Sequence, residues 1–526
     1  MRYRTLIPSF VIASLVLVWA GCDSFLEPEP KSFSTTANFY TQPSDFEQAI
    51  NGVYVQLRNL TDGDPYINAT DRRAHTLTKH FDVNLPHTVS GDPQTDEFTM
   101  VASNGNSISL WGNTYDLIKE ANVVINRIEE VEFEDGALKS QIVGEAKFMR
   151  AFAYWFAVQT WGGVPIVLQD ARTPAEGIPE GGRASVEAVH QQIITDLQDA
   201  IAGLPVSYAG GQAGRITRGA AKFLLGRTYL LTGEYQAALS EFEGLDGGEF
   251  SYMLLDDYRE VFNPANKNNA ESILEIQYNP GLAGQGDWDV FNDILPINAG
   301  GALLPPERPV FVPNGNMLPT PDIIDSYEDG DARFEGSIAW FIDPENSSFP
   351  EVAWPEGNLA TSTVPGDSIP YLHKYFWPGQ VTSSGEPLNN RILFRFADVL
   401  LSAAEAHWRL GEPGPAETYL NRVRARADLG PVDLSNFTGE WTGDPLGDAI
   451  LQERSIELLA EGHMWLDLKR FGSDVAIRVM EAHGERFKAR DNKVTADMYL
   501  IEDYKLLYPI PPGDIELADL EQNPVW

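Results

Sequence analysis

The stretch AAKFLLGRTYLLTGEYQAALSEFEGL, residues 220 to 245, alternates large apolar side chains with small ones around a central glycine. This pattern is typical of a helix, a short turn and a second helix. The positions that carry it are Leu225, Tyr229, Gly233, Tyr235, Ala238 and Phe242. The stretch therefore predicts a helical hairpin.

These positions are spaced as in a tetratricopeptide repeat, a two-helix unit that cannot bury its apolar face alone. A second stretch of the same kind, ADVLLSAAEAHWRLGEPGPAETYLNRVRARADLG, spans residues 397 to 430. Two or more such units bury each other's apolar faces and build a curved scaffold. The fold is therefore expected to be mainly α, a scaffold of tetratricopeptide-like helical hairpins.

Further helices are expected before the first hairpin. The capping-box pattern Ser44-Asp45-Phe46-Glu47 begins one, and residues 110–131 have helical spacing. Residues 144–163 are apolar nearly all round, which indicates a buried helix. Residues 61–107 are rich in Asp, Asn, Gly and Pro and are expected to form long loops.

The character of the chain changes between residues 279 and 390, which hold 15 of the 35 prolines and four of the 12 tryptophans. No helical period survives there, and irregular stretches of this length tend to be functional. We expect one globule made of residues 35–278 and 391–526, with 279–390 as a loop-rich insertion that forms the ligand face. A short strand, SILEIQY at 272–278, is expected just before the insertion.

The N-terminus is typical of a secretory signal peptide, residues 1–21, with arginines, an apolar stretch and small residues before Cys22. Cys22 is the single cysteine, and its position resembles a bacterial lipobox, in which the thiol is acylated and becomes the mature N-terminus. Trp19 stands where that motif usually has leucine. Residues 22–34 predict a polar tether. No other stretch approaches about 18 consecutive apolar residues, so we expect a lipid anchor rather than a membrane span.

Charge and cysteine content exclude several classes of protein. The formal net charge is -38, from 38 Lys+Arg against 76 Asp+Glu. Such a surface repels phosphate backbones, so no nucleic-acid partner is expected. One cysteine excludes a disulfide framework within the chain and any Cys-cluster zinc or iron–sulfur site. No cofactor is expected.

Motifs of catalysis are also missing from the sequence. It contains no Gly-x-Ser-x-Gly elbow, no phosphate-binding loop and no His-Glu-x-x-His motif. Asp-Gly-Asp stretches at 62–64 and 329–331 could each contribute to a calcium site, but neither continues into a full EF-hand loop. No metal site is expected.

Glu453, Glu457 and Glu461 recur every four residues on one helical stretch. Paired carboxylates can carry out acid–base chemistry, but like charges at this spacing repel each other unless cations pair with them. Pairing is the favoured interpretation. The nearest candidate partners are Arg422, Arg424, Arg426 and Arg454. Glu405 and Arg409, in the favourable order on another helix, are expected to pair with each other.

Tryptophans in loops are candidate ligand contacts. A loop tryptophan offers an apolar face and one hydrogen-bond donor, which suits the face of a sugar ring, although it can also merely fix its own loop. The candidates in the insertion are Trp288, Trp340, Trp354 and Trp377. Tryptophans in helical, apolar contexts are expected in the core: Trp111, Trp155, Trp161, Trp408 and Trp465.

Six stretches follow the lipobox in order: FYTQPSDFEQAINGVY (39–54), WGNTYDLIKEANVVI (111–125), GEAKFMRAFAYWFAVQTWGGVPIV (144–167), RFADVLLSAAEAHWRLG (395–411), LQERSIELLAEGHMWLDLKRFG (451–472) and LYPIPPGDIELADLEQNP (507–524). Together they resemble the SusD/RagB family of starch-binding outer-membrane lipoproteins of the Bacteroidetes lineage. The acidic residues Asp23, Glu27 and Glu29 also resemble the signal that exports such lipoproteins to the cell surface.

The resemblance implies a mostly helical fold, a loop-rich face that binds glycan, and no catalysis. It implies a partner, a TonB-dependent outer-membrane transporter of the SusC type, over which the lipoprotein sits as a lid. It also implies that certain charged residues hold helices together: Arg395, Asp398, Glu405, Glu453, Arg454, Glu461 and Asp467.

The predicted function is capture of oligosaccharide or polysaccharide at the cell outer membrane, by a lipid-anchored protein facing the exterior, and delivery to the transporter. Two alternatives stay open. One is an all-helical glycoside hydrolase, and the other is a tetratricopeptide-type adaptor that binds protein and no glycan.

Overall fold

The computed structural model describes residues 39–78, 94–171, 176, 181–208, 210–278, 318–342, 351–353, 369–375, 377, 389–490 and 498–526. The predicted signal peptide, Cys22 and the predicted tether lie outside the described residues, as does most of the insertion. Among the helices of the described part, none is long and apolar enough to cross a membrane.

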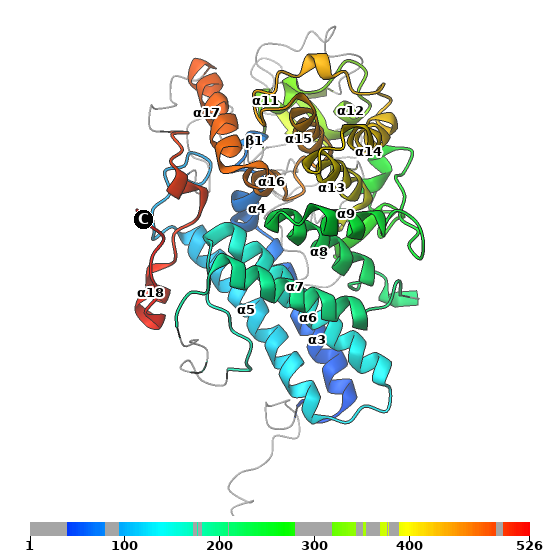
Figure 1. The fold of residues 1–526 in the computed structure, drawn as a ribbon, viewed down its shortest axis with the longest axis vertical. Coiled ribbons are helices and arrows are strands. Elements are labelled where there is room, and N and C mark those ends of the chain that lie inside the picture. The colour runs from blue at the N-terminus through cyan, green and yellow to red at the C-terminus, as the bar shows by residue number, and fades with distance from the viewer. Residues whose placement is uncertain are drawn as a thin grey trace, which may run out of the picture.

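Four long helices lie side by side at one end of the molecule (Figure 1): α3 (Pro43–Thr61), α5 (Gly105–Arg127), α6 (Gly136–Trp161) and α7 (Val186–Gly203). Helix α6 contacts the other three. Asp135 caps its N-terminus, because the carboxylate accepts hydrogen bonds from the amides of Ala137 and Leu138. Every residue from Phe148 to Trp161 is buried, so the prediction of a buried helix here is confirmed.

Both predicted hairpins are present. Helices α8 (Arg218–Thr232) and α9 (Tyr235–Glu243) form the first, and α13 (Phe396–Arg409) and α14 (Pro413–Arg426) form the second. Helix α13 contacts α9, so the two hairpins bury each other as expected. Gly233 ends α8 with a φ of 79°, a left-handed conformation that glycine adopts without strain. Gly226 lets the two helices approach closely, because a Cβ there would lie 2.5 Å from the Phe242 ring.

The remaining helices are α4 (Asp64–Thr70), α11 (Pro321–Asp325), α12 (Arg333–Ser337), α15 (Pro445–Glu457), α16 (Met464–Phe471), α17 (Ser473–Arg490) and α18 (Pro512–Ala518). Single 3-10 turns are η1 (Ile128–Glu130), η2 (Gly210–Gln212), η3 (Tyr258–Phe262), η4 (Leu434–Asn436) and η5 (Asp503–Leu506). The expectation of loops alone over 61–107 was wrong, because α4 lies there. Likewise α11 and α12 lie inside the insertion. They have five residues each, too few for a helical period to show in the sequence.

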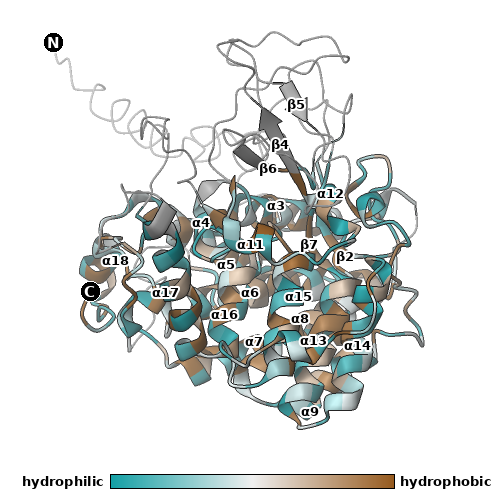
Figure 2. Cartoon of the chain, turned by 90° about the horizontal axis from the view of Figure 1, so that it is seen from above, coloured by the Kyte–Doolittle hydropathy of each residue, from teal (hydrophilic) through white to brown (hydrophobic). Residues whose placement is uncertain are grey.

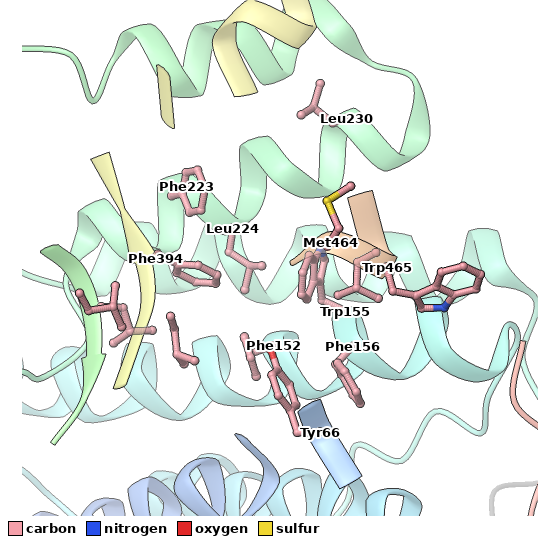
Figure 3. Close-up of a cluster of buried hydrophobic side chains, with 14 of the residues drawn as sticks. Tyr66, Phe152, Trp155, Phe156, Phe223, Leu224, Leu230, Phe394, Met464 and Trp465 are labelled. Atoms are coloured by element: carbon pink, nitrogen blue, oxygen red, sulfur yellow. The ribbon is translucent and has the colours of Figure 1, made fainter. Parts of the chain in front are cut away.

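The central core lies between α6, α8 and the strand β7 (Figure 3). Phe394 of β7 contacts Phe152 and Phe223, with ring centroids 6.2 and 5.0 Å apart. Four of the five tryptophans expected in the core are buried: Trp111, Trp155, Trp161 and Trp465. The fifth, Trp408, is half-buried and stacks on Phe471.

Three small antiparallel sheets include strands that lie within the insertion or at its ends. Strand β1 (Leu77–Thr78) pairs with β3 (Leu318–Pro319), and β4 (Ile338–Ile342) lies between β5 (Glu351–Ala353) and β6 (Ile369–Leu372). The expected strand before the insertion is confirmed as β2 (Ser272–Ile276), and it pairs with β7 (Arg391–Arg395) just after the insertion.

The two ends of the insertion therefore meet. Ile276 lies opposite Arg391, and the amide of Tyr278 donates to the side chain of Asn390 at 3.0 Å. Asn390 also donates to the carboxylate of Glu275 at 2.7 Å. The insertion leaves and rejoins the helical frame at one place.

Ion pairs join helices far apart in the chain, and we name the first group the aspartate cluster. Arg227 of α8 donates to Asp398 of α13 at 2.9 Å and to Asp467 of α16 at 2.7 Å. Arg454 of α15 lies 2.7 Å from Asp398 and 2.6 Å from Asp467. All four side chains are at most 2% exposed. Burial raises the pKa of Asp398, but Arg227 and Arg454 outweigh it and hold that pKa below its ordinary value.

Glu405 belongs to the same cluster and does not pair with Arg409. Its carboxylate accepts from Arg470 at 2.6 Å, and Arg470 in turn donates to Asp467. Arg409 instead donates to the carbonyl of Phe471 and lies over the Trp408 ring. The expected pair within one helix was wrong, because burial makes a cross-helix partner for Glu405 more favourable than a solvated neighbour.

A second group, the glutamate cluster, uses the three glutamates spaced four residues apart. Glu457 accepts from Arg333, Arg395 and Arg426, Glu453 from Arg333 and Arg424, and Glu461 from Arg395 and Lys374. The favoured interpretation, pairing with cations, is confirmed. Two of the proposed partners were wrong, since Arg454 serves the aspartate cluster and Arg422 pairs with Asp246.

Two members of the glutamate cluster come from the insertion and attach it to the frame. Arg333 lies on α12, and its guanidinium also binds Asp331 at 2.7 Å. Lys374 follows β6; its ammonium donates to the carbonyls of Glu457 and Leu459 at 3.0 and 2.9 Å and to the Glu461 carboxylate at 2.5 Å. Burial lowers the pKa of Lys374 to about 8. These contacts attach α12 and the segment after β6 to α15 and to the turn that follows it.

Asp398→Asn is expected to destabilise the protein by about 3–5 kcal/mol, because it leaves Arg227 and Arg454 buried with half their negative charge removed. The folded pKa of Asp398 lies below the unfolded value, so its contribution to stability is fully present above about pH 3.9 and is lost progressively as the pH falls below that value toward the folded pKa. The difference between the urea midpoints of the native protein and the variant should therefore be smaller at pH 3 than at pH 5. Asp474→Asn, at an exposed pair with Arg478, is the control and should change little. A constant gap would contradict the assignment.

Gly226→Ala is expected to lower the melting temperature, although alanine normally stabilises a helix by about 1 kcal/mol relative to glycine. The reason is the Phe242 ring, which occupies the space of the new methyl group. Gly112→Ala on α5 is the matched control, because nothing lies within 4 Å of its Cβ position, and it should raise the melting temperature. Equal shifts in both variants would show that the hairpin tolerates a wider separation.

Candidate functional site

The candidate site is the part of the insertion around Trp377, the predicted ligand residue whose side chain the structure describes. Trp377 is half-buried. The guanidinium of Arg259, from η3 of the frame, lies over its ring at 4.8 Å from the centroid. The indole Nε1 is buried and has no hydrogen-bond partner within the described residues. One face of Trp377 is thus covered by a cation, and contact with a ligand would use its other face or its edge.

Arg259 is held over Trp377 by a short chain of hydrogen bonds. Its Nη1 lies 2.8 Å from a ring nitrogen of His373, and Nδ1 of His373 lies 2.6 Å from the carbonyl oxygen of Glu335. Burial and then the Arg259 charge lower the pKa of His373 to about 3, so the imidazole is neutral at pH 7. A neutral imidazole can donate to the Glu335 carbonyl and accept from Arg259. His373 is adjacent to Lys374, so the arrangement is continuous with the glutamate cluster.

Trp340 lies on β4, the central strand of the three-stranded sheet. Its backbone is opposite Ala353 of β5 and Pro370 of β6. The sheet places Trp340 and the segment leading to Trp377 in one substructure, but the side chain of Trp340 is outside the described residues. Trp288 and Trp354 also lie outside them, as does Cys22. Their roles stay predictions.

In each of the two Asp-Gly-Asp stretches, which could contribute to a calcium site, one aspartate makes hydrogen bonds or ion pairs with neighbouring residues. Both carboxylate oxygens of Asp331 bond to Arg333, and the Asp62 carboxylate accepts from the amide of Gly63. Across the described residues, no group of three or more His, Cys, Asp or Glu side chains is arranged to hold a metal ion.

The three glutamates of the glutamate cluster are also engaged. Burial raises the pKa of Glu453, a property of general acids, but Arg333 and Arg424 bind its carboxylate and it is only 3% exposed. Burial raises the pKa of Glu457 too, yet Arg426, Arg395 and Arg333 hold it well below its ordinary value. Their chemistry is that of ion pairs between helices.

One aromatic residue outside the insertion was missed by sequence reasoning. Trp441 lies in the segment between η4 and α15, among Gly, Thr and Asp, and it is half-buried beside a hollow of the surface. Its sequence context is the same as that of the four insertion tryptophans. Its position in a polar loop rich in Gly, Thr and Asp is the signal by which the sequence could have identified it.

Two family models match the chain in consecutive parts. One, described as "SusD family", covers residues 271–526, and the other, described as "Starch-binding associating with outer membrane", covers residues 24–230. The match to the first of these models begins just before β2, the strand that leads into the insertion.

Individual relatives match over most of their length. A SusD-like protein of Formosa agariphila, P25, is 26% identical over 98% of this chain and 96% of that protein. A SusD-like protein of Bacteroides ovatus is 27% identical over 87% of this chain and 81% of that protein. The solved structure of a laminarin-binding SusD-like protein is 26% identical, with a TM-score of 0.72 over 93% of this chain and all of that one.

The arrangement of helices is also shared with surface glycan-binding protein A of Bacteroides thetaiotaomicron, at 20% identity and a TM-score of 0.69. The frame of tetratricopeptide-like hairpins is thus common to proteins of quite different sequence. With two consecutive family models that between them leave out only the first residues and 231–270, this chain belongs to the SusD family.

Proposed function

We propose that this protein binds oligosaccharide or polysaccharide through its insertion, without cleaving it. The observation that carries the proposal is the similarity, over nearly the full length of both chains, to a SusD-like protein that binds laminarin. The insertion is suited to this role because β2, β7, Arg333 and Lys374 attach it to a rigid frame. Loops held on such a frame can position aromatic faces for a ligand at little cost in ordering.

The same family membership supports a place in nutrient uptake. The protein would be anchored to the outer membrane through a lipid on Cys22 and face the exterior. It would pass its glycan to a TonB-dependent transporter of the SusC type. The lipobox-like sequence and the description of one matching model, which mentions the outer membrane, support this location.

Laminarin is the first glycan to test, in native affinity gels. Replacing the four insertion tryptophans together by Ala (Trp288, Trp340, Trp354 and Trp377) is expected to abolish retardation, because ring stacking supplies most of the contact area in a shallow site. Trp377→Phe keeps an aromatic face without the indole donor and should retain most of the retardation. The melting temperature of each variant controls for loss of the Arg259 contact. Unchanged retardation of a folded quadruple variant would rule these residues out.

Cys22→Ala is expected to abolish metabolic labelling with palmitate and to release the protein from the membrane fraction, because two or more acyl chains on one residue give stable anchoring. Labelling is the decisive measurement, since a transporter could retain an unlipidated chain at the membrane. Labelling that persists in the variant would place the lipid elsewhere.

A further inference from the structure

A second hollow lies away from Trp377, and we name it the Trp441 pocket. Its volume is about 450 Å³, within the range of about 300–1,000 Å³ of small-molecule sites. Figure 2 looks onto α11, with α17 on one side and α15 on the other, and these helices together with the segment 436–441 form its walls. The residues that matter here are His75, Asp322, Phe437, Trp441, Gln452 and Arg486.

His75 is the feature of this pocket that lacks a structural explanation. It is 2% exposed, and neither ring nitrogen has a hydrogen-bond partner within the described residues. Buried polar groups of proteins are nearly always paired, so such a group needs a reason. Burial lowers the pKa of His75 to about 4, so its imidazole is neutral at pH 7 and offers one donor and one acceptor. The side chain of His75 lines the pocket.

Trp441 supplies an aromatic face that is held in place from its backbone. Its amide donates to Asp448 at 3.3 Å, the next amide, of Thr442, donates to the same carboxylate at 2.7 Å, and Arg478 donates to the Trp441 carbonyl. The Trp441 ring meets the His75 ring edge to face, with centroids 5.8 Å apart. The pocket thus combines a fixed aromatic platform with the unpaired imidazole beside it.

The remaining polar groups are arranged as acceptors and donors around that platform. Asp322 is oriented by His483 and Arg486, each at 2.7 Å. Gln452 lines the pocket and donates to the carbonyl of Ser326 at 3.2 Å. Fixed groups of both kinds around an aromatic face suit a ligand with many hydroxyl groups.

Charge narrows the ligand class. The wall carries four carboxylates, Asp322, Asp325, Glu440 and Asp448, against one arginine, and that arginine is already paired with Asp322. A phosphate, a sulfated sugar or a uronic acid would bring another negative charge to a site that already has an excess. A neutral sugar meets no such repulsion.

We propose that the Trp441 pocket binds a neutral saccharide unit, as a site additional to the insertion, with the pyranose ring on Trp441 and hydroxyl groups on His75. The proposal takes its ligand class partly from the proposed function but does not depend on the insertion tryptophans. In this proposal, the sugar hydroxyl groups are the hydrogen-bond partners of the His75 imidazole.

The test is fluorine NMR of the lipidated protein labelled with 5-fluorotryptophan, in a detergent without a sugar headgroup. Resonances of Trp441 and Trp377 are assigned from Trp441→Phe and Trp377→Phe. The probes are methyl glycosides of glucose, galactose, mannose, xylose and N-acetylglucosamine, with glucuronic acid as the anionic control. The expected result is a saturable shift of the Trp441 resonance with at least one neutral glycoside and none with glucuronic acid.

His75→Phe keeps the ring and removes both nitrogens. It should weaken that glycoside by about tenfold or more while leaving the melting temperature equal or higher, which a merely structural histidine would not do. A Trp441 resonance unmoved by all five neutral glycosides, or equal affinity in the folded His75→Phe variant, overturns the proposal. The Trp377 resonance and the laminarin gels report the insertion separately, so either site can fail while the other stands.

Discussion

Buried guanidinium–carboxylate pairs between helices distant in sequence are the constraint on which the rest of the fold depends. Arg227 and Asp467 are 240 residues apart, yet their side chains meet at 2.7 Å in a region shielded from water. Each ion loses its hydration on folding, and its partners offset that cost, so the loss of one member leaves an uncompensated buried charge. Helices α8, α13, α15 and α16 can meet in one geometry only if every member finds its partner.

The glutamate cluster extends this constraint from the frame to the insertion. Arg333 and Lys374 are fully buried insertion residues, and both end on glutamates of α15 or the turn after it. Loops far from the frame can then differ widely between proteins, because their attachment does not depend on their own packing. This separation agrees with relatives that keep the same helical frame at about 20% identity.

The helices, the hairpins and the buried α6 could be predicted from the sequence because their periodic side chains report on local neighbours. Partners across the fold could not. Glu405 was assigned to Arg409 four residues away, whereas its partner Arg470 comes from another helix. For the candidate site, composition located the insertion and its tryptophans. The stacking of Arg259 on Trp377 and the pocket beside Trp441 could not be predicted, because they depend on contacts between separate segments. The spacing of residues along the chain does not show which distant segments come into contact.

The pairing of β2 with β7 has a consequence for how such proteins diversify. The two paired strands hold the ends of the insertion next to each other. The entropic cost of closing the loop between them therefore grows only with the logarithm of the loop's length. A segment of another length or composition can therefore replace the present one with little effect on the helices behind it. The helical frame and the recognition segment can therefore evolve separately. A change of ligand preference then requires a change in that one segment of the chain.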